Sequence, residues 1–217
     1  MPHCCAGESL DIFGEKSARR ELRRYLRKGL GGSDAPQIAD WAEEQGLDGA
    51  TVMEVGGGIG QIQVELLRRG AERGTVVEVV SGYRGPADEL AGAVGVADRS
   101  VFVLADLLET PDAVDSVDVV VLRRVVCCSA NGPELLGIAA GKARRTLLVS
   151  YPRATRANRS FARVQNVFFA LVRKRFRIFV HPPEQLERAA VGHGLARTRT
   201  TRGPIWETAQ FDVAGAS

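Results

Sequence analysis

The chain has 217 residues, of which 45% are hydrophobic and 25% charged. This size and composition suit one globular α/β domain, or a core domain with a helical extension. The formal net charge of +3 is small, no apolar run approaches the roughly 20 residues that span a bilayer, and the N-terminus lacks the order of a secretion signal, so we expect a cytoplasmic protein with no membrane partner.

The first 48 residues predict two helices ahead of the main domain. The first is expected over 9–29, where glycines at 29, 31 and 32 end it. The second is expected over 36–45, with Trp41 on its apolar side and Gly46 at its end. We therefore expect a helical cap over 1–48 and an α/β domain over 49–217.

Strands and helices alternate after the cap. Short, continuously apolar runs predict five strands, at 51–55, 75–80, 100–104, 117–122 and 146–151. Helices are expected between and after them, at 61–69, 86–94, 133–140 and 184–190. Apolar strands separated by helices indicate a parallel sheet covered on both faces, and right-handed crossovers make it doubly wound.

The C-terminal segment breaks the alternation. Residues 195–201 and 205–213 predict two strands joined by a tight turn at Gly203-Pro204. The expected fold is therefore a doubly wound, mostly parallel α/β sheet of seven strands that ends in an antiparallel hairpin.

Three of the expected strands end in residues suited to a nucleoside-like ligand. The first leads into Glu54-Val55-Gly56-Gly57-Gly58-Ile59-Gly60, whose glycines allow the backbone to approach a ligand closely. Glu78 lies on the second strand, where a carboxylate can accept hydrogen bonds from both ribose hydroxyls. Asp106 follows the third strand and can accept from an adenine amino group. In a parallel sheet these carboxyl ends share one edge.

From Thr51 onward the chain resembles class I S-adenosylmethionine-dependent methyltransferases of the small-molecule type, similar to magnesium-protoporphyrin methyltransferase-like proteins. The dinucleotide pattern GxGxxG does not fit, because the third glycine, Gly60, comes one residue early. The resemblance implies S-adenosylmethionine as cofactor and methyl transfer to a small molecule. It also implies that Glu54, Gly56, Gly58 and Gly60 line the methionine portion, Glu78 the ribose, and Asp106 with Leu107 the adenine.

Two arginines, Arg123 and Arg124, follow the fourth strand and depart from the family pattern. An arginine near the sulfonium would place two cations together, which is unfavourable. Arg123 either points outward or pairs with Asp106 or Glu54, or it binds an anionic group of the substrate together with Arg124. In the last case the alternative function is a non-methylating reaction on the same fold, such as elimination or cyclisation with an anionic leaving group.

Three further side chains are candidates for substrate contact. His181, before the helix expected at 184–190, is a candidate general base, and its alternative role is capping or packing. Tyr25 and Tyr151 either touch the substrate or pack in the core. The paired cysteines Cys4-Cys5 and Cys127-Cys128 lack metal-binding spacing, so we expect no metal.

The segment 161–172 is strongly apolar, with a stripe at helical spacing. Core packing, a substrate lid, or a surface for a homodimer or partner subunit would each explain it. Arginine clusters at 19–28 and 173–177 indicate a solvated helix face or an anionic partner. Without interleaved aromatic residues or a known binding module, we do not expect nucleic acid.

Overall fold

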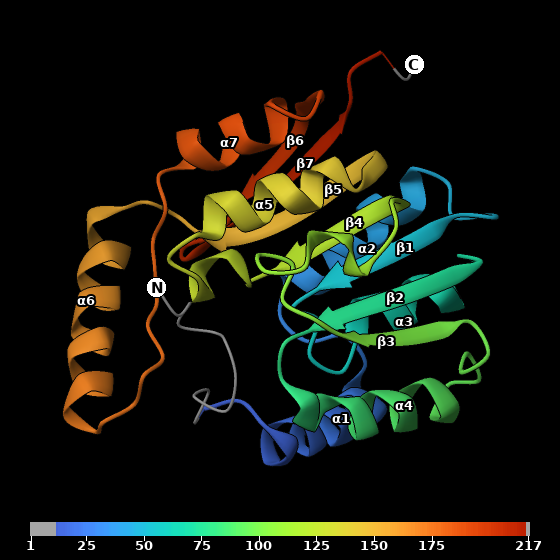
Figure 1. Cartoon of the computed structure of the whole chain (residues 1–217), viewed down its shortest axis with the longest axis horizontal. Helices are drawn as coiled ribbons and strands as arrows, with labels where there is room; N and C mark the ends of the chain where they lie inside the picture. The colour runs from blue at the N-terminus through green and yellow to red at the C-terminus, as the bar shows by residue number, and fades with distance from the viewer. Residues whose placement is uncertain (1–11, 216–217) are drawn as a thin grey trace.

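A computed structural model describes residues 12–215 and contains one seven-stranded sheet with the strand order β3-β2-β1-β4-β5-β7-β6 (Figure 1). The strands are β1 (Thr51–Val55), β2 (Arg73–Glu78), β3 (Ser100–Leu104), β4 (Val117–Arg123), β5 (Ala143–Pro152), β6 (Leu195–Arg202) and β7 (Trp206–Val213). The first five strands are parallel, and β7 pairs antiparallel with both β5 and β6. The predicted fold class, with its C-terminal hairpin, is confirmed.

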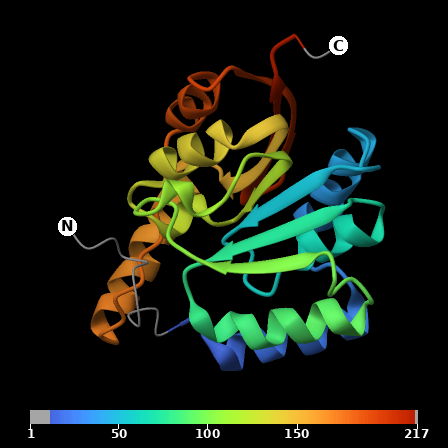
Figure 2. The same cartoon turned by 45° about the vertical axis from the view of Figure 1, so that its right-hand side comes forward.

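Helices cover both faces of this sheet, as the turned view shows (Figure 2). They are α1 (Glu15–Lys28), α2 (Asp34–Glu44), α3 (Gln61–Arg68), α4 (Arg84–Ala93), α5 (Gly132–Gly141), α6 (Arg156–Leu171) and α7 (Pro183–Val191). The first four contribute to the hydrophobic core on one face, and α5 and α7 contribute to the core on the other.

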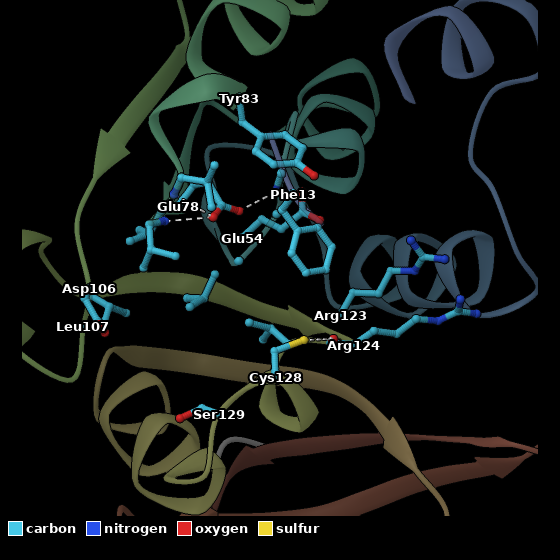
Figure 3. Close-up of a pocket in the computed structure, with 18 of the residues that line it drawn as sticks. Phe13, Glu54, Glu78, Tyr83, Asp106, Leu107, Arg123, Arg124, Cys128 and Ser129 are labelled. Atoms are coloured by element: carbon cyan, nitrogen blue, oxygen red, sulfur yellow. Dashed lines mark hydrogen bonds between the residues drawn. The ribbon is translucent and has the colours of Figure 1, made fainter. Parts of the chain in front are cut away.

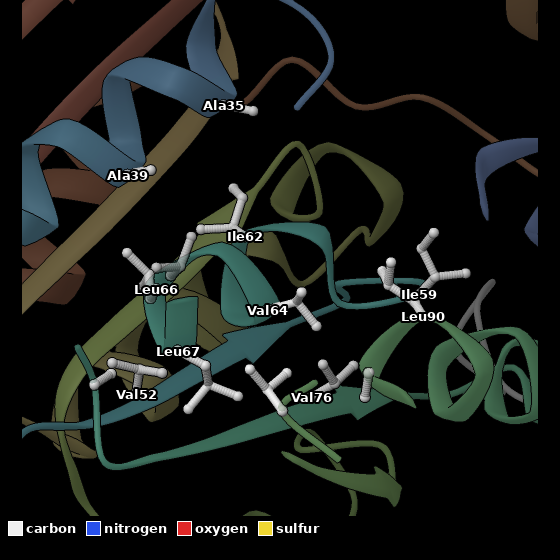
Figure 4. Packing of buried hydrophobic residues seen from close by; sticks show 14 of the residues in the cluster. Ala35, Ala39, Val52, Ile59, Ile62, Val64, Leu66, Leu67, Val76 and Leu90 are labelled. Carbon is white, nitrogen blue, oxygen red and sulfur yellow. The ribbon is translucent and has the colours of Figure 1, made fainter. Parts of the chain in front are cut away.

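Strand β4 explains why its sequence is apolar throughout. Val119 and Val121 pack into the first core, whereas Val120 and Leu122 pack into the second. Alternate side chains of a strand point to opposite faces, so a central strand with both faces covered needs apolar residues at every position. Figure 4 shows part of the first core, where Val52 of β1 and Val76 of β2 meet Ile62 and Leu66 of α3.

The two N-terminal helices belong to this first core. Leu22 and Tyr25 of α1 and Ile38 and Trp41 of α2 are buried together with side chains of α3 and α4. The predicted helix over 9–29 begins at Glu15 within the described residues and ends at Lys28, where the Gly29 N–H donates to the Tyr25 carbonyl. Residues 1–11, including the pair Cys4-Cys5, lie outside the described residues.

Helix α6 stands at the edge of the molecule, away from the sheet (Figure 1). Ala162 is its one buried residue among those described. Core packing is therefore wrong as an explanation of the apolar stripe at 161–172, because Phe161, Val164, Phe168 and Leu171 are exposed. Among residues 12–215, no helix is both long and apolar enough to span a membrane.

Candidate functional site

A cavity of about 410 Å³ opens at the carboxyl ends of β1, β2, β3 and β4 (Figure 3). Its volume lies in the range of roughly 300–1,000 Å³ that is usual for small-molecule sites. Eight of the residues predicted from the sequence line it: Glu54, Gly56, Gly58, Glu78, Asp106, Leu107, Arg123 and Arg124.

The glycine turn after β1 needs its glycines for two reasons. Gly56 and Gly58 have φ angles of 63° and 59°, in the left-handed region that glycine adopts without strain. A Cβ on Gly56 would lie 2.3 Å from Val125 Cγ2, and one on Gly58 would lie 3.0 Å from Tyr83 Cε1. The turn therefore brings bare backbone to the cavity wall.

Gly60 differs from the other two glycines because it does not line the cavity. It precedes the first residue of α3 with a φ of 74°, and a Cβ there would lie 2.4 Å from Val76 Cγ2. Its small size allows α3 to pack closely on β2.

Glu54 joins the cavity to the start of α3. Its Oε2 accepts hydrogen bonds from the backbone N–H groups of Ile62 at 3.1 Å and Gln63 at 2.9 Å. The carboxylate therefore satisfies N–H groups that have no partner inside the helix. Burial nevertheless raises the pKa of Glu54 to about 7, because a charged carboxylate is costly away from water.

Glu78, the last residue of β2, is held in place by backbone groups. Its Oε2 accepts from the Gly58 N–H at 3.0 Å, and its Oε1 accepts from the N–H groups of Val79 at 2.8 Å and Val80 at 3.1 Å. Burial raises its pKa, although these three N–H groups oppose the change. Since a carboxylate has about four acceptor positions, Glu78 keeps capacity for a further donor.

Asp106 follows β3 directly and is oriented by the next turn. Its Oδ1 accepts from the Leu108 N–H at 3.0 Å. Asp106 and Leu107 lie across the cavity from the two arginines (Figure 3). Thus the acidic residues after β2 and β3 meet in one cavity with the glycine turn, as the sequence predicts.

Arg123 and Arg124 share one acidic partner, Asp34 of α2. Arg123 donates from Nε to Asp34 Oδ2 at 3.1 Å and from Nη2 to Oδ1 at 3.0 Å, and Arg124 donates to the same two oxygens at 2.8 and 2.7 Å. Burial disfavours the Asp34 carboxylate, but the two arginines outweigh it and lower its pKa. The expected pairing of Arg123 with Asp106 or Glu54 is wrong.

The pairing with Asp34 turns the guanidinium groups aside. In Figure 3 both arginine side chains point away from Glu54 and Glu78. Arg124 also lies over the ring of Trp206, 4.4 Å from its centroid. Two cations share one carboxylate, so this part of the cavity wall keeps a net positive charge.

Three other candidate residues do not line the cavity. The Tyr25 hydroxyl donates to Glu65 at 3.0 Å, and the buried Tyr151 hydroxyl donates to Glu207 at 2.9 Å. His181 Nε2 lies 3.0 Å from the carbonyl oxygens of Val126 and Ser129. Since carbonyls only accept hydrogen bonds, Nε2 carries a proton and His181 anchors the turn η3 (Val126–Cys128).

Sequence reasoning missed several polar residues of the cavity, above all Glu21 and Gln61. Glu21 Oε1 accepts from the Tyr83 hydroxyl at 3.4 Å, and its Oε2 lies 3.5 Å from Gln61 Nε2. Burial raises the pKa of Glu21. Glu21 is one of two acidic residues in a strongly basic helix, and this is the one signal that could have singled it out.

Gln61 Oε1 is buried without a hydrogen-bond partner in the part of the chain that the structure describes. Gln61 is 7% exposed and lines the cavity. Buried acceptors are nearly always satisfied, so this oxygen is suited to a donor on a bound molecule. No group of three or more His, Cys, Asp or Glu residues within 12–215 could hold a metal ion.

Solved structures with similar folds include magnesium protoporphyrin IX methyltransferase from Synechocystis with bound S-adenosylhomocysteine. The match has a TM-score of 0.72 and 17% identity, and covers 94% of this chain and 98% of that one. An O-methyltransferase family protein from Burkholderia thailandensis has a TM-score of 0.69 and 17% identity, with 93% and 61% covered.

A putative sarcosine dimethylglycine methyltransferase from Galdieria sulphuraria is also similar, with a TM-score of 0.67 and 13% identity over 91% of this chain and 98% of that one. The chain has the fold of the class I S-adenosylmethionine-dependent methyltransferases. No protein-family model matches the sequence, and no curated protein matches it. At these identities the likeness shows the fold alone.

The cavity of this methyltransferase fold contains groups suited to S-adenosylmethionine. The cofactor offers ribose hydroxyls, an adenine amino group and an ammonium group as donors, and the cavity offers the acceptors Glu78, Asp106 and Gln61 Oε1. The bare backbone of Gly56 and Gly58 leaves space beside them. The residues present therefore fit this cofactor.

Proposed function

We propose that the protein is an S-adenosylmethionine-dependent methyltransferase that acts on a small molecule bearing an anionic group. The observation that carries the proposal is the single cavity that contains the glycine turn, Glu78 and Asp106. The methyltransferase fold of the chain supports it. When bound, the cofactor supplies an electrophilic methyl group.

In this proposal each part of the cavity has a separate task. Glu78 accepts hydrogen bonds from the ribose, and Asp106 with Leu107 contacts the adenine. The turn at Gly56 and Gly58 lies beside the methionine portion, where Gln61 Oε1 accepts from the ammonium group. The remaining contribution of the chain to catalysis is positioning, which alone can supply a large part of a rate enhancement.

The acceptor molecule would contact the part of the wall formed by Arg123, Arg124, Phe13 and Phe176. Phe13 and Phe176 pack edge to face, with 5.3 Å between their ring centroids. The arginines keep one positive charge beyond that neutralised by Asp34. An acceptor with an apolar body and a carboxylate or similar anion complements both features.

The alternative, a non-methylating elimination or cyclisation, depended on a free Arg123 close to the sulfonium. Both Nε and Nη2 of Arg123 donate to Asp34, and Nη2 also donates to the Gly31 carbonyl at 2.8 Å. This arrangement removes the electrostatic objection to methyl transfer. Methyl transfer is therefore the function that we propose, and the alternative gains no specific observation.

Calorimetric titration with S-adenosylmethionine and S-adenosylhomocysteine tests the proposal. We expect both to bind. An Asp106→Asn variant should bind about tenfold more weakly, because the amide loses a charged acceptor while its oxygen still accepts from the Leu108 N–H. The matched control is Asp115→Asn on the exposed surface. Absence of binding by the folded wild-type protein at millimolar ligand would overturn the proposal.

A further inference from the structure

Helix α6 exposes an apolar row that core helices normally bury. Phe161, Val164, Phe168 and Leu171 recur at helical spacing and are 62%, 69%, 58% and 77% exposed. Val167 and Val172 widen the row, at 59% and 45% exposed. A contiguous exposed apolar surface of this kind marks an interaction site. We call these six residues the α6 apolar row.

The opposite side of α6 is held to the protein mainly by polar contacts. Asn166 donates to the Ile178 carbonyl and accepts from the Ile178 N–H, both at 2.8 Å. Asn158 Nδ2 donates to the carbonyls of Arg153 at 3.0 Å and Ile205 at 3.1 Å. These bonds fix the orientation of the helix, so the α6 apolar row faces solvent because the protein holds it there.

A basic row runs beside the apolar one. Arg156, Arg159 and Arg163 recur at helical spacing and are exposed. Arg173 and Arg175 follow the helix and are also exposed. The sequence from 135 to 183 contains no Asp or Glu. This surface therefore combines apolar and positive groups without any acidic residue of its own segment.

We propose that α6 docks in the plane of an anionic membrane surface, with the apolar row at the acyl boundary and the basic row on the headgroups. Helices with an exposed apolar face and arginines on the polar side bind such interfaces without spanning them. Anionic headgroups attract the basic row. This proposal replaces the sequence expectation of no membrane partner, and it concerns peripheral contact only.

Charge favours a membrane over a second copy of the chain. Two α6 helices packed together would bring Arg156, Arg159 and Arg163 near their symmetry mates, with no acidic residue of α6 to offset the repulsion. A headgroup layer offers negative charge across the whole length of the helix.

The docked helix would lie next to the mouth of the cavity. Phe169 of α6 packs against Phe176 with ring centroids 5.6 Å apart, and Phe176 packs against Phe13. Phe176 and Phe13 both line the cavity. A continuous aromatic path thus connects the proposed membrane contact to the cavity, whatever reaction occurs there.

Vesicle flotation of the full chain tests the proposal, with vesicles of phosphatidylcholine alone and of phosphatidylcholine with about 30% phosphatidylserine. We expect binding to the anionic vesicles and its loss at high salt, because salt screens the charge attraction. An Arg159→Gln/Arg163→Gln variant should bind about 25-fold more weakly, at about fivefold per arginine. A Phe168→Ser/Leu171→Ser variant should lose at least about tenfold.

Matched controls change the same residue types elsewhere on the surface. Arg20→Gln/Arg23→Gln alters exposed arginines of α1, and Val191→Ser/Ile205→Ser alters side chains that are 52% and 49% exposed. Both should bind anionic vesicles within about twofold of wild type. Circular dichroism should show that all variants are folded, since every changed side chain is exposed.

Several results would overturn the proposal. These are no binding to anionic vesicles, equal binding to neutral ones, or equal losses in the control and α6 variants. A dimer in sizing chromatography that Phe168→Ser/Leu171→Ser converts to monomer would show that a second copy covers the row. Because flotation needs neither cofactor nor turnover, its failure and the failure of the methyltransferase proposal are separate outcomes.

Discussion

Arg123 at the end of β4 donates two hydrogen bonds to Asp34 at the start of α2, at 3.1 and 3.0 Å, across 89 residues of sequence. Ser150 of β5 donates to the same carboxylate at 3.2 Å. Asp34 therefore joins the N-terminal helices to the carboxyl ends of two central strands. It also turns the Arg123 guanidinium away from the glycine turn.

An Asp34→Asn variant should lose stability. Asp34 is 4% exposed, and removal of its charge leaves two arginines without their shared partner. Loss of one member of a buried ion pair costs about 3–5 kcal/mol. Since the side chains of Arg123 and Arg124 are 17% and 33% exposed, we expect a lower value, about 2–3 kcal/mol, in urea unfolding at pH 7.

Asp88→Asn, on the exposed side of α4, is the control for Asp34→Asn and should change the unfolding free energy by less than about 0.5 kcal/mol. The Asp34 pKa is lowered from its ordinary value of 3.8. Its contribution is therefore present above that pH and lost as the pH falls through the folded-state pKa. A stability difference between wild type and Asp34→Asn that persists undiminished at pH 2 would contradict this assignment.

Glu54 should make the protein less stable as the pH rises. Burial raises its pKa from 4.5 to about 7, so between these values the folded state binds more protons than the unfolded state. The stabilisation is complete below pH 4.5 and is lost as the pH rises through 7, with a total of roughly 3 kcal/mol. Urea unfolding from pH 4.5 to 8 measures it.

Glu54→Gln is the matched variant, because its amide oxygen can still accept from the N–H groups of Ile62 and Gln63. Other groups with raised pKa values, such as Glu21 and Glu78, titrate in both proteins. The difference between the two pH profiles therefore isolates Glu54. Parallel profiles would show that the Glu54 pKa is not raised.

Gly56→Ala should destabilise the glycine turn. The alanine would adopt a positive φ, and its Cβ would lie 2.3 Å from Val125 Cγ2 and 2.8 Å from Val125 Cβ. Strain of this kind costs about 1–3 kcal/mol. The control is Gly92→Ala in α4, which has nothing within 4 Å of the new Cβ and should gain up to about 1 kcal/mol from helix propensity. Thermal denaturation of both variants would reveal an error if they shifted equally.

Local patterns in the sequence predicted much of the fold and part of the site. The strands at Thr51–Val55 and Ser100–Leu104 have the predicted bounds, because buried parallel strands are short continuous apolar runs. Glu78 and Asp106 share a cavity because strand ends of a parallel sheet share an edge. The second strand ends at Glu78 rather than Val80, since the N–H groups of Val79 and Val80 turn back to its carboxylate.

Contacts between distant segments could not be predicted in this way. No periodicity relates Asp34 to Arg123, and nothing local shows that Glu21 of α1 lines the cavity. The α6 apolar row has the same spacing in a core helix and in a surface helix. Only the direction in which Asn158 and Asn166 hold the helix separates these cases.

Gln61→Met should stabilise the protein without ligand and weaken cofactor binding. An unsatisfied buried acceptor costs about 1–3 kcal/mol, and Gln61 Oε1 has no partner within the described residues. Methionine has a similar size and removes that cost, so we expect a gain of about 1 kcal/mol. If the oxygen accepts from the cofactor ammonium group, affinity for S-adenosylhomocysteine should fall about five- to tenfold. Thermal denaturation with and without the ligand measures both effects.

Gln63→Met is the matched control on the same helix. Gln63 is 1% exposed, and its amide exchanges hydrogen bonds with the Ser100 hydroxyl at 3.0 and 3.4 Å. Its replacement leaves Ser100 unpaired and should lower stability by about 1–2 kcal/mol, with the affinity of the folded protein unchanged. Opposite stability shifts at Gln61 and Gln63 would show that the polar group at 61 serves binding rather than folding. A loss of stability at both positions would contradict that role, because it would mean that Gln61 is already satisfied within the folded protein.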